Sequence, residues 1–189
     1  MDLPPQEALP QAPPEKSSTP RVPAYILGEG LVSQEQLSAF LQEHNNLLEK
    51  TLTDEFAVIY REEAALEGVN HDLAFAQMCL ETGFLYFGNL VTPDMNNFCG
   101  LGAIDENHRG ESFPDIRTGV RAQIQHLKGY ATTAALNQPL VDPRYVYIRK
   151  GLSPTIAGLS GTWARDTEYA AKIISILERL YDFAFGRQL

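Results

Sequence analysis

The chain has 189 residues, which is the size of a single domain with a short extension. Its formal net charge of -9 argues against nucleic acid and anionic membrane surfaces as partners, because both attract basic patches. Apolar residues make up 44% of the chain, which is enough for a hydrophobic core. No apolar run approaches the about 18 residues that a membrane-spanning helix needs.

The first 23 residues differ in composition from the rest of the chain. They contain seven of the twelve prolines, together with Gln, Glu and Ser. Such a segment buries too little apolar surface to fold, and proline favours extended conformations. We therefore interpret residues 1–23 as a disordered tether and residues 24–189 as the folded domain. A disordered terminus without a role is the alternative.

The pattern after the tether predicts an extended arm followed by helices. Residues 24–31 are apolar and punctuated by glycine, which favours an arm that packs on the domain. Ser33 and Gln36 form a capping-box pattern at the start of a first helix. Apolar residues at helical spacing over 53–67 predict a second helix, which Gly68 closes.

A third helix is predicted between Asn70, a good N-cap, and the break at Thr82-Gly83. One of its sides is apolar until Glu81, where a carboxylate ends the stripe. Desolvation at such a position raises a carboxyl pKa and makes the group a usable general acid near neutral pH. The alternative is that Glu81 is a surface carboxylate at a helix end.

The second half of the domain is also predicted to be mainly helical. Residues 103–114 are polar and favour a loop or a short hairpin. Further helices are expected to begin at Thr118, at Ser153-Pro154 and after Asp166. No long period-2 alternation is present, so the sequence predicts a mainly α domain. Polar residues of the Thr118 helix are expected on a solvated face, or one of them in a cleft: Gln123, Gln125 and His126.

The segment after the third helix has the residue types of a sugar-binding cleft wall. Asn96 and Asn97 offer amides for hydroxyl or N-acetyl groups, Phe98 offers a ring, and Gly100 permits close approach. The alternative for the two asparagines is an ordinary turn. Trp163, the only tryptophan, is either a core residue or a platform on which a sugar stacks.

The two cysteines, Cys79 and Cys99, are interpreted as small buried thiols, with a disulfide as the alternative. The four histidines are scattered, and no Cys/His cluster has the spacing of metal ligands. The sequence therefore predicts neither a metal site nor a cofactor.

Three segments together resemble a known family. QMCLETGFLYFG followed by NNFCGLGA resembles the signature of bacterial glucosaminidase domains, the family 73 glycoside hydrolases. GVRAQIQHLKGYA and WARDTEYAAKI resemble later segments of these domains in the same order, so the likeness covers roughly residues 50–180. The resemblance implies a lysozyme-like α fold with a cleft between helical lobes and room for a small β-hairpin. It also implies cleavage of the β-1,4 bond between N-acetylglucosamine and N-acetylmuramic acid in peptidoglycan.

The resemblance implies particular catalytic residues. By motif match Glu81 is the general acid, and Tyr169 in DTEYA orients the N-acetyl group or the attacking water, unless it only anchors the last helix. The second carboxylate is not matched clearly. Asp105, Glu106 and Glu111 lie on the loop after Gly102, and we rank Glu111 first as an assisting group. A substrate-assisted mechanism, in which the N-acetyl group attacks, stays open. The expected substrate-binding residues are Gln77, Asn96, Asn97, Phe98, Gly100 and Trp163.

Two other functions fit the same features. A lytic transglycosylase also uses a single glutamate but forms an anhydro product, and a non-catalytic wall-binding module would leave Glu81 unused. We expect the domain to bind peptidoglycan glycan strands as a monomer outside the cytoplasm. The first residues lack a basic region followed by an apolar run, so our hypothesis is that the numbering starts after a removed export or lipoprotein signal.

Overall fold

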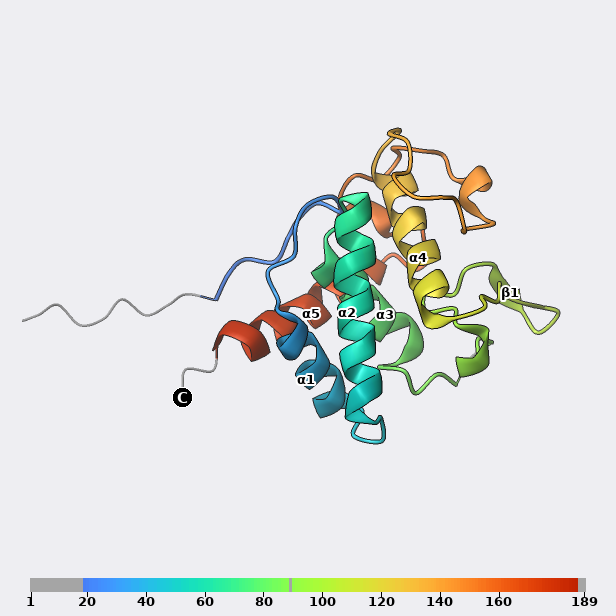
Figure 1. Ribbon diagram of the computed structural model, residues 1–189. Helices are drawn as coiled ribbons and strands as arrows, with labels where there is room; N and C mark the ends of the chain where they lie inside the picture. The colour runs from blue at the N-terminus through green and yellow to red at the C-terminus, as the bar shows by residue number, and fades with distance from the viewer. Residues whose placement is uncertain (1–18, 89, 187–189) are drawn as a thin grey trace, which may run out of the picture.

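The computed structural model describes residues 19–88 and 90–186, so most of the predicted tether lies outside the described residues. The described chain is a helical domain with one small hairpin (Figure 1). The α-helices are α1 (Gln34–His44), α2 (Lys50–Glu67), α3 (His71–Thr82), α4 (Ile116–Ala131) and α5 (Tyr169–Tyr181). Short 3-10 turns are η1 (Pro93–Met95), η2 (Tyr145–Tyr147) and η3 (Ala157–Leu159), and the π-helical turn η4 (Asp182–Gly186) follows α5. The antiparallel strands are β1 (Ala103–Asp105) and β2 (His108–Arg109).

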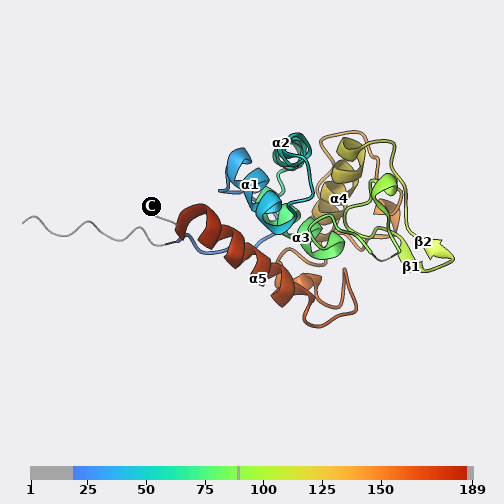
Figure 2. The same cartoon turned by 90° about the horizontal axis from the view of Figure 1, so that it is seen from below.

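Helix α3 is the central element of the fold. In Figure 2 it lies between α1, α2, α4 and α5, and it contacts α2, α4 and α5. Its side chains from His71 to Cys79 are all buried, so this helix has no solvated face over most of its length. A helix that is apolar nearly all round belongs in a core. The last turn of α3 is less buried than the rest and carries Glu81, so it brings the candidate acid to the edge of the core.

Local sequence signals account for the ends of the first helices. The Ser33–Gln36 capping box is present at α1, as predicted. The side chain of Asn70 accepts a hydrogen bond from the backbone N–H of Leu73 and caps α3. Gly68 and Gly83 end α2 and α3 in the left-handed region, which a residue without Cβ adopts at low cost.

The predicted N-terminal arm is confirmed. Ile26 is fully buried, and its backbone bonds Pro154 on one side and Asn70 on the other. Further along, the buried carboxylate of Asp72 accepts bonds from the backbone N–H groups of Leu31 and Val32, at 2.7 and 3.2 Å. These hydrogen bonds hold the arm against the N-terminal end of α3.

Several predicted boundaries need correction. Helix α4 begins at Ile116, because Asp115 rather than Thr118 supplies the cap. Helix α5 begins at Tyr169, and Asp166 lies before it in a turn, where its carboxylate accepts the N–H of Glu168. The helix predicted from Ser153-Pro154 is absent there. The Ser153 hydroxyl instead donates to the carbonyl of Gly158 and folds the segment back on itself, with only the turn η3 inside it.

The hairpin β1–β2 projects from the side of the domain opposite the C-terminal end of α5 (Figure 2). Its turn is held by Asp105, whose carboxylate accepts the N–H groups of Asn107 and His108, each at 2.9 Å. The loop before the hairpin lies directly on α4. A Cβ on Gly119 would collide with the carbonyl of Asn96, so this glycine permits the close approach.

Candidate active site

Glu81 lies on the last turn of α3, where the buried face of the helix reaches the surface. The residue is partly buried. Burial raises the pKa of its carboxyl above the ordinary value of 4.5, while the nearby donors Tyr169 and Trp163 oppose the rise. Desolvation of the ionised form is the physical cause of a raised carboxyl pKa. The sequence-based expectation of a desolvated carboxylate agrees with this environment.

Tyr169 is the immediate partner of Glu81. It is the first residue of α5 and is buried, and its hydroxyl donates a hydrogen bond to Oε1 of Glu81. The same hydroxyl accepts a bond of 2.9 Å from Nε2 of Gln77, one turn earlier on α3. The start of α5 therefore meets the end of α3 through two polar contacts inside an otherwise apolar core.

The polar contacts continue into the core beyond Gln77. Nε2 of Gln123 on α4 donates to Oε1 of Gln77 at 2.8 Å and to the carbonyl of Ala74 at 3.0 Å. The hydroxyl of Tyr60 on α2 donates to Oε1 of Gln123 at 2.6 Å. We call this series, from Tyr60 through Gln123, Gln77 and Tyr169 to Glu81, the hydrogen-bond chain.

Two adjoining cavities open beside Glu81. The smaller has a volume of about 120 Å³, and Glu81 lines it together with Phe87, Leu90 and Val91. The larger has a volume of about 260 Å³ and lies on the other side of Gly100, which lines both cavities with Ala103. A Cβ on Gly100 would stand 3.6 Å from Oε2 of Glu81. The carboxylate oxygen that Tyr169 does not engage therefore faces the place where the cavities meet.

The segment between the end of α3 and the wall of the smaller cavity has an unusual backbone. Phe84, Leu85 and Phe87 all have positive φ, at 57°, 65° and 58°. Side chains of this size rarely adopt the left-handed region, and such strain persists only where the surroundings enforce it. The strained turns follow directly after Gly83 and redirect the chain from the end of α3 to the cavity wall.

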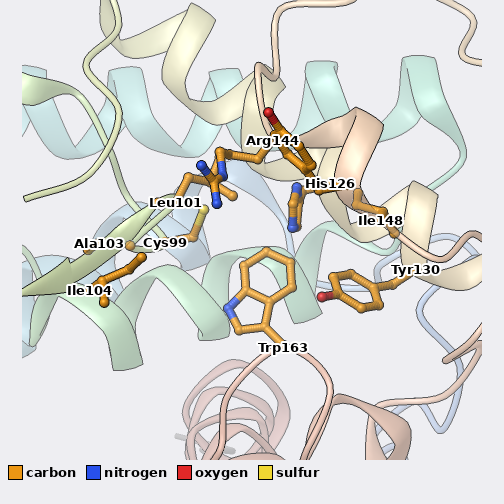
Figure 3. A pocket seen from close by; sticks show the side chains of 12 residues that line it. Cys99, Leu101, Ala103, Ile104, His126, Tyr130, Arg144, Ile148 and Trp163 are labelled. Atoms are coloured by element: carbon orange, nitrogen blue, oxygen red, sulfur yellow. The ribbon is translucent and has the colours of Figure 1, made fainter. Parts of the chain in front are cut away.

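Aromatic side chains form one wall of the larger cavity (Figure 3). The partly buried indole of Trp163 packs edge-to-face with the His126 ring, with centroids 4.9 Å apart, and lies 5.7 Å from the Tyr130 ring. Nδ1 of His126 is 2.7 Å from the buried carboxylate of Asp142, which fixes the imidazole. Arg144 lies across from Trp163 in the same view. This cavity combines flat rings with a cationic side chain.

The three loop carboxylates have different surroundings. Asp105 holds the hairpin turn, and its hydrogen bond with His108 lowers its carboxyl pKa. Glu106 is exposed near the tip of the hairpin. Glu111 is partly buried after β2, and its Oε1 lies 3.8 Å from Nη1 of Arg144. Of the three, only Glu111 is oriented by a residue that lines the larger cavity.

The structure changes the interpretation of several expected substrate-binding residues. Gln77 is fully buried, and both of its amide ends bond other core groups, so it offers no surface to a sugar. Phe98 is 2% exposed and packs edge-to-face on Phe56 with centroids 5.0 Å apart, so the expectation that it stacks on a sugar is wrong. Its ring was predicted at the cleft because the sequence does not show which side of a loop is covered.

The side-chain amides of Asn96 and Asn97 also form hydrogen bonds within the protein. Asn97 is buried and uses its amide three times: it donates to the carbonyls of Leu101 and Glu111 and accepts the N–H of Leu101. Asn96 donates to the carbonyl of Phe113 at 3.0 Å and adopts a positive φ of 49°. Both side chains therefore shape the loop, and Asn97, Gly100 and Trp163 are the expected residues that line cavities.

Residues of α4 that were expected on a solvated face are instead buried. Gln123, Gln125 and His126 all lie inside, because α4 is covered by α2 and α3 on one side and by the loop of η2 on the other. His126 and Arg144 line the larger cavity, and Gln123 belongs to the hydrogen-bond chain. The available signal was the lack of charge in the run from Ala122 to Leu127, which a solvated helix face rarely shows.

Both cysteines are buried free thiols, as interpreted from the sequence. Burial raises the pKa of both thiols, which keeps them neutral. Among residues 19–88 and 90–186, no group of three or more His, Cys, Asp and Glu side chains could hold a metal ion. No helix within these same ranges is long and apolar enough to cross a membrane.

A helical domain that presents a desolvated glutamate at a helix end, above a cleft with aromatic walls, has the architecture of lysozyme-like glycoside hydrolases. Residues 57–182 match the model of the Glucosaminidase family, described as mannosyl-glycoprotein endo-beta-N-acetylglucosaminidase. The chain belongs to this family, which places it among the glycoside hydrolases.

The chain is similar to individual proteins as well as to the family. An uncharacterized protein of Borreliella burgdorferi is 38% identical over 159 residues, which cover 84% of this chain and 78% of the relative. The crystal structure of S. aureus autolysin E in complex with the muropeptide NAM-L-Ala-D-iGlu shares the fold, with a TM-score of 0.55 and 16% identity. That match covers 88% of this chain and 76% of the autolysin chain. The predicted family and the predicted lysozyme-like fold class are confirmed.

Proposed function

We propose that the protein is a peptidoglycan hydrolase that cleaves the β-1,4 bond between N-acetylglucosamine and N-acetylmuramic acid, with Glu81 as the general acid. One observation carries this proposal. Glu81 is a desolvated carboxylate with one oxygen bonded to Tyr169 and the other facing the junction of two cavities. A glycosidase needs a protonated carboxyl group that faces the bound substrate, because the leaving oxygen must be protonated as the glycosidic bond breaks.

The two oxygens of Glu81 have separate tasks in this mechanism. Oε1 accepts the Tyr169 hydrogen bond, so the transferable proton resides on Oε2, beside Gly100. The scissile oxygen then lies over Gly100, with one sugar toward each cavity. When the bond breaks, Glu81 becomes an anion, and the Tyr169 hydroxyl stabilises that charge.

The positive charge that develops at the anomeric carbon requires a second group. We assign an assisting role to Glu111, which Arg144 orients at the rim of the larger cavity. The N-acetyl group of the substrate is the alternative nucleophile. A loop carboxylate that assists without being essential is compatible with either route.

The larger cavity suits a substituted sugar. Its volume of about 260 Å³ and the rings of Trp163 and Tyr130 provide an apolar surface against which a pyranose packs. Arg144 supplies a cation on the same cavity, which matches a carboxylate of the peptide stem that N-acetylmuramic acid carries. This substrate lies outside the cytoplasm, so the protein is proposed to act there, as a monomer.

The test is analysis of the products from purified sacculi. After digestion and borohydride reduction, mass spectrometry identifies the sugar at each new reducing end. Reduced N-acetylglucosamine supports the proposal, reduced N-acetylmuramic acid contradicts the bond assignment, and an anhydro product identifies a lytic transglycosylase. Glu81→Gln is expected to abolish release, because acid catalysis alone contributes roughly 10²–10⁴-fold. Glu178→Gln, on the exposed face of α5, is the matched control and keeps full activity. A wild-type protein that binds sacculi and releases nothing is a binding module.

A further inference from the structure

The hydrogen-bond chain has a direction that can be worked out from a single backbone carbonyl. Nε2 of Gln123 lies 3.0 Å from the carbonyl of Ala74, and a carbonyl can only accept. The nitrogen of this amide must therefore face Ala74, since the reversed amide would bring two acceptor oxygens together. The orientation of Gln123 is fixed by chemistry, although an isolated amide could be placed either way.

The orientation of Gln123 determines every later bond. Its second N–H points to Gln77 at 2.8 Å, so the atom of Gln77 that it meets is the oxygen. Nε2 of Gln77 then faces the hydroxyl of Tyr169 at 2.9 Å and donates to it. A hydroxyl that accepts from Gln77 keeps its only proton for another partner, and that partner is Oε1 of Glu81.

We propose that Gln123 is a positioning residue, which acts through Gln77 to hold the Tyr169 hydroxyl as a hydrogen-bond donor to Glu81. This inference rests on the proposed function of Glu81 and adds a residue that touches neither Glu81 nor the cavities. Gln123 is fully buried on α4, two hydrogen bonds away from Tyr169. Without it, Gln77 is free to turn its oxygen toward Tyr169 and draw the phenolic proton away from Glu81.

The surroundings of Glu81 contain few groups that would titrate together with it. Tyr169 from α5 and Cys99 from the loop after η1 interact with Glu81, and burial raises the pKa of both groups. Deeper in the core, the pKa values of Cys79 and Tyr60 are raised by burial as well. All four groups are neutral where a carboxyl titrates, so the titration of Glu81 reports on its uncharged donors, of which Tyr169 has the larger effect on the pKa and Trp163 the smaller.

The test compares substitutions at two buried members of the hydrogen-bond chain. Gln123→Met keeps the length of the side chain but removes both donors, so the pKa of Glu81 is expected to rise by roughly half a unit to one unit. The alkaline limb of the kcat–pH profile rises with it. Tyr60→Phe also removes a buried hydrogen bond, but the carbonyl of Ala74 still orients Gln123. This variant is therefore expected to lose stability without a shift in the alkaline limb of the kcat–pH profile.

Titration of the side-chain carbonyl carbon of Glu81 by NMR gives the same pKa without any activity. A wild-type protein that cleaves no glycan therefore refutes the proposed function and leaves the positioning role to be decided by this titration. A pKa that is unchanged in Gln123→Met, or that shifts equally in Tyr60→Phe, overturns the proposal.

A measurement on the wild-type protein covers the case in which Gln123→Met does not fold. Charge on Glu81 polarises the hydrogen bonds of the chain that leads to it. The NMR signals of the side-chain amides of Gln77 and Gln123 are therefore expected to shift with pH at the same midpoint as the titration of Glu81. Gln125 is the internal control, because it is buried on the same helix but bonds Pro139 instead. If the amide signals of Gln77 and Gln123 do not change at the pH at which Glu81 titrates, the proposal is contradicted.

Discussion

The hydroxyl of Tyr169 donates a hydrogen bond to Glu81, a residue 88 positions earlier in the sequence. This contact joins the first turn of α5 to the last turn of α3. Burial raises the pKa of Glu81, and the Tyr169 bond works in the opposite direction. The pair therefore sets the pH range over which Glu81 keeps its proton.

Tyr169→Phe is expected to raise the pKa of Glu81 further. A hydrogen bond to a charged group contributes about 1.5–3 kcal/mol, which corresponds to an upward shift of about one to two units. The pH profile of glycan hydrolysis should keep its shape while its alkaline limb moves upward, and kcat should fall because the ionised product state loses its donor. An alkaline limb at the wild-type position would show that Tyr169 only anchors α5.

Glu81→Gln is expected to make the protein more stable while it removes the activity. Because the folded-state pKa is raised, the folded protein holds this proton more tightly than the unfolded chain does. The contribution to stability is complete below the unfolded pKa and is lost as the pH rises through the folded pKa. Each unit of the rise corresponds to about 1.4 kcal/mol, which glutamine recovers.

Urea unfolding of both proteins at about pH 4 and about pH 8 measures this effect, since the advantage of the variant should appear only at the higher pH. Glu178→Gln serves again as the control and should track the wild type at both values. Equal stability of wild type and Glu81→Gln at the higher pH would contradict the desolvation of Glu81.

Local signals in the sequence were sufficient for the scaffold around Glu81. The Ser33 capping box, the Asn70 cap and the stop at Gly83 depend on neighbours within a few residues, so they could be predicted and were found. Asp166 was a wrong choice for the last cap because several polar residues precede α5, and local pattern does not rank them. Its carboxylate instead accepts the N–H of Glu168 and pairs with Lys172.

The hydrogen-bond chain could not be predicted in the same way. Its members lie on α2, α3, α4 and α5, and each contact spans at least 46 positions. Gln77 was assigned to substrate because an amide one turn before the acid suits either role. The decision depends on whether α5 covers that side of α3, and this is a property of the packed helices. Phe98 was misassigned for the same reason.

Asn97→Ala is expected to destabilise the loop between η1 and the hairpin. The buried amide makes three bonds to Leu101 and Glu111, and each is worth about 0.5–1.5 kcal/mol net. A loss of roughly 2–4 kcal/mol in the free energy of unfolding follows. This replaces the expectation from sequence that turnover suffers more than stability, because both donors of the amide are already used by carbonyls of the loop.

Thermal and urea unfolding measure the loss, and Asn107→Ala at the exposed hairpin tip is the control, with no more than a small change expected. If Asn97→Ala melts like the wild type but hydrolyses glycan poorly, the original assignment of Asn97 to the substrate is restored.

Glu111→Gln is expected to lower kcat by about tenfold, which is less than the loss in Glu81→Gln. Glu111 lies 3.8 Å from Arg144 at the larger cavity, whereas Asp105 is committed to the hairpin turn and Glu106 is exposed. The amide retains the size of the side chain and removes the charge that would stabilise the anomeric centre. Steady-state hydrolysis of purified glycan strands measures the effect.

The other loop carboxylates provide the controls for Glu111. Glu106→Gln should leave kcat unchanged, and Asp105→Asn should lower the stability of the hairpin more than the rate. A Glu111→Gln variant as inactive as Glu81→Gln would make Glu111 a full catalytic partner. Nearly full kcat in the variant that combines all three amides would leave the N-acetyl group of the substrate as the nucleophile, because no loop carboxylate would then be available to stabilise the charge.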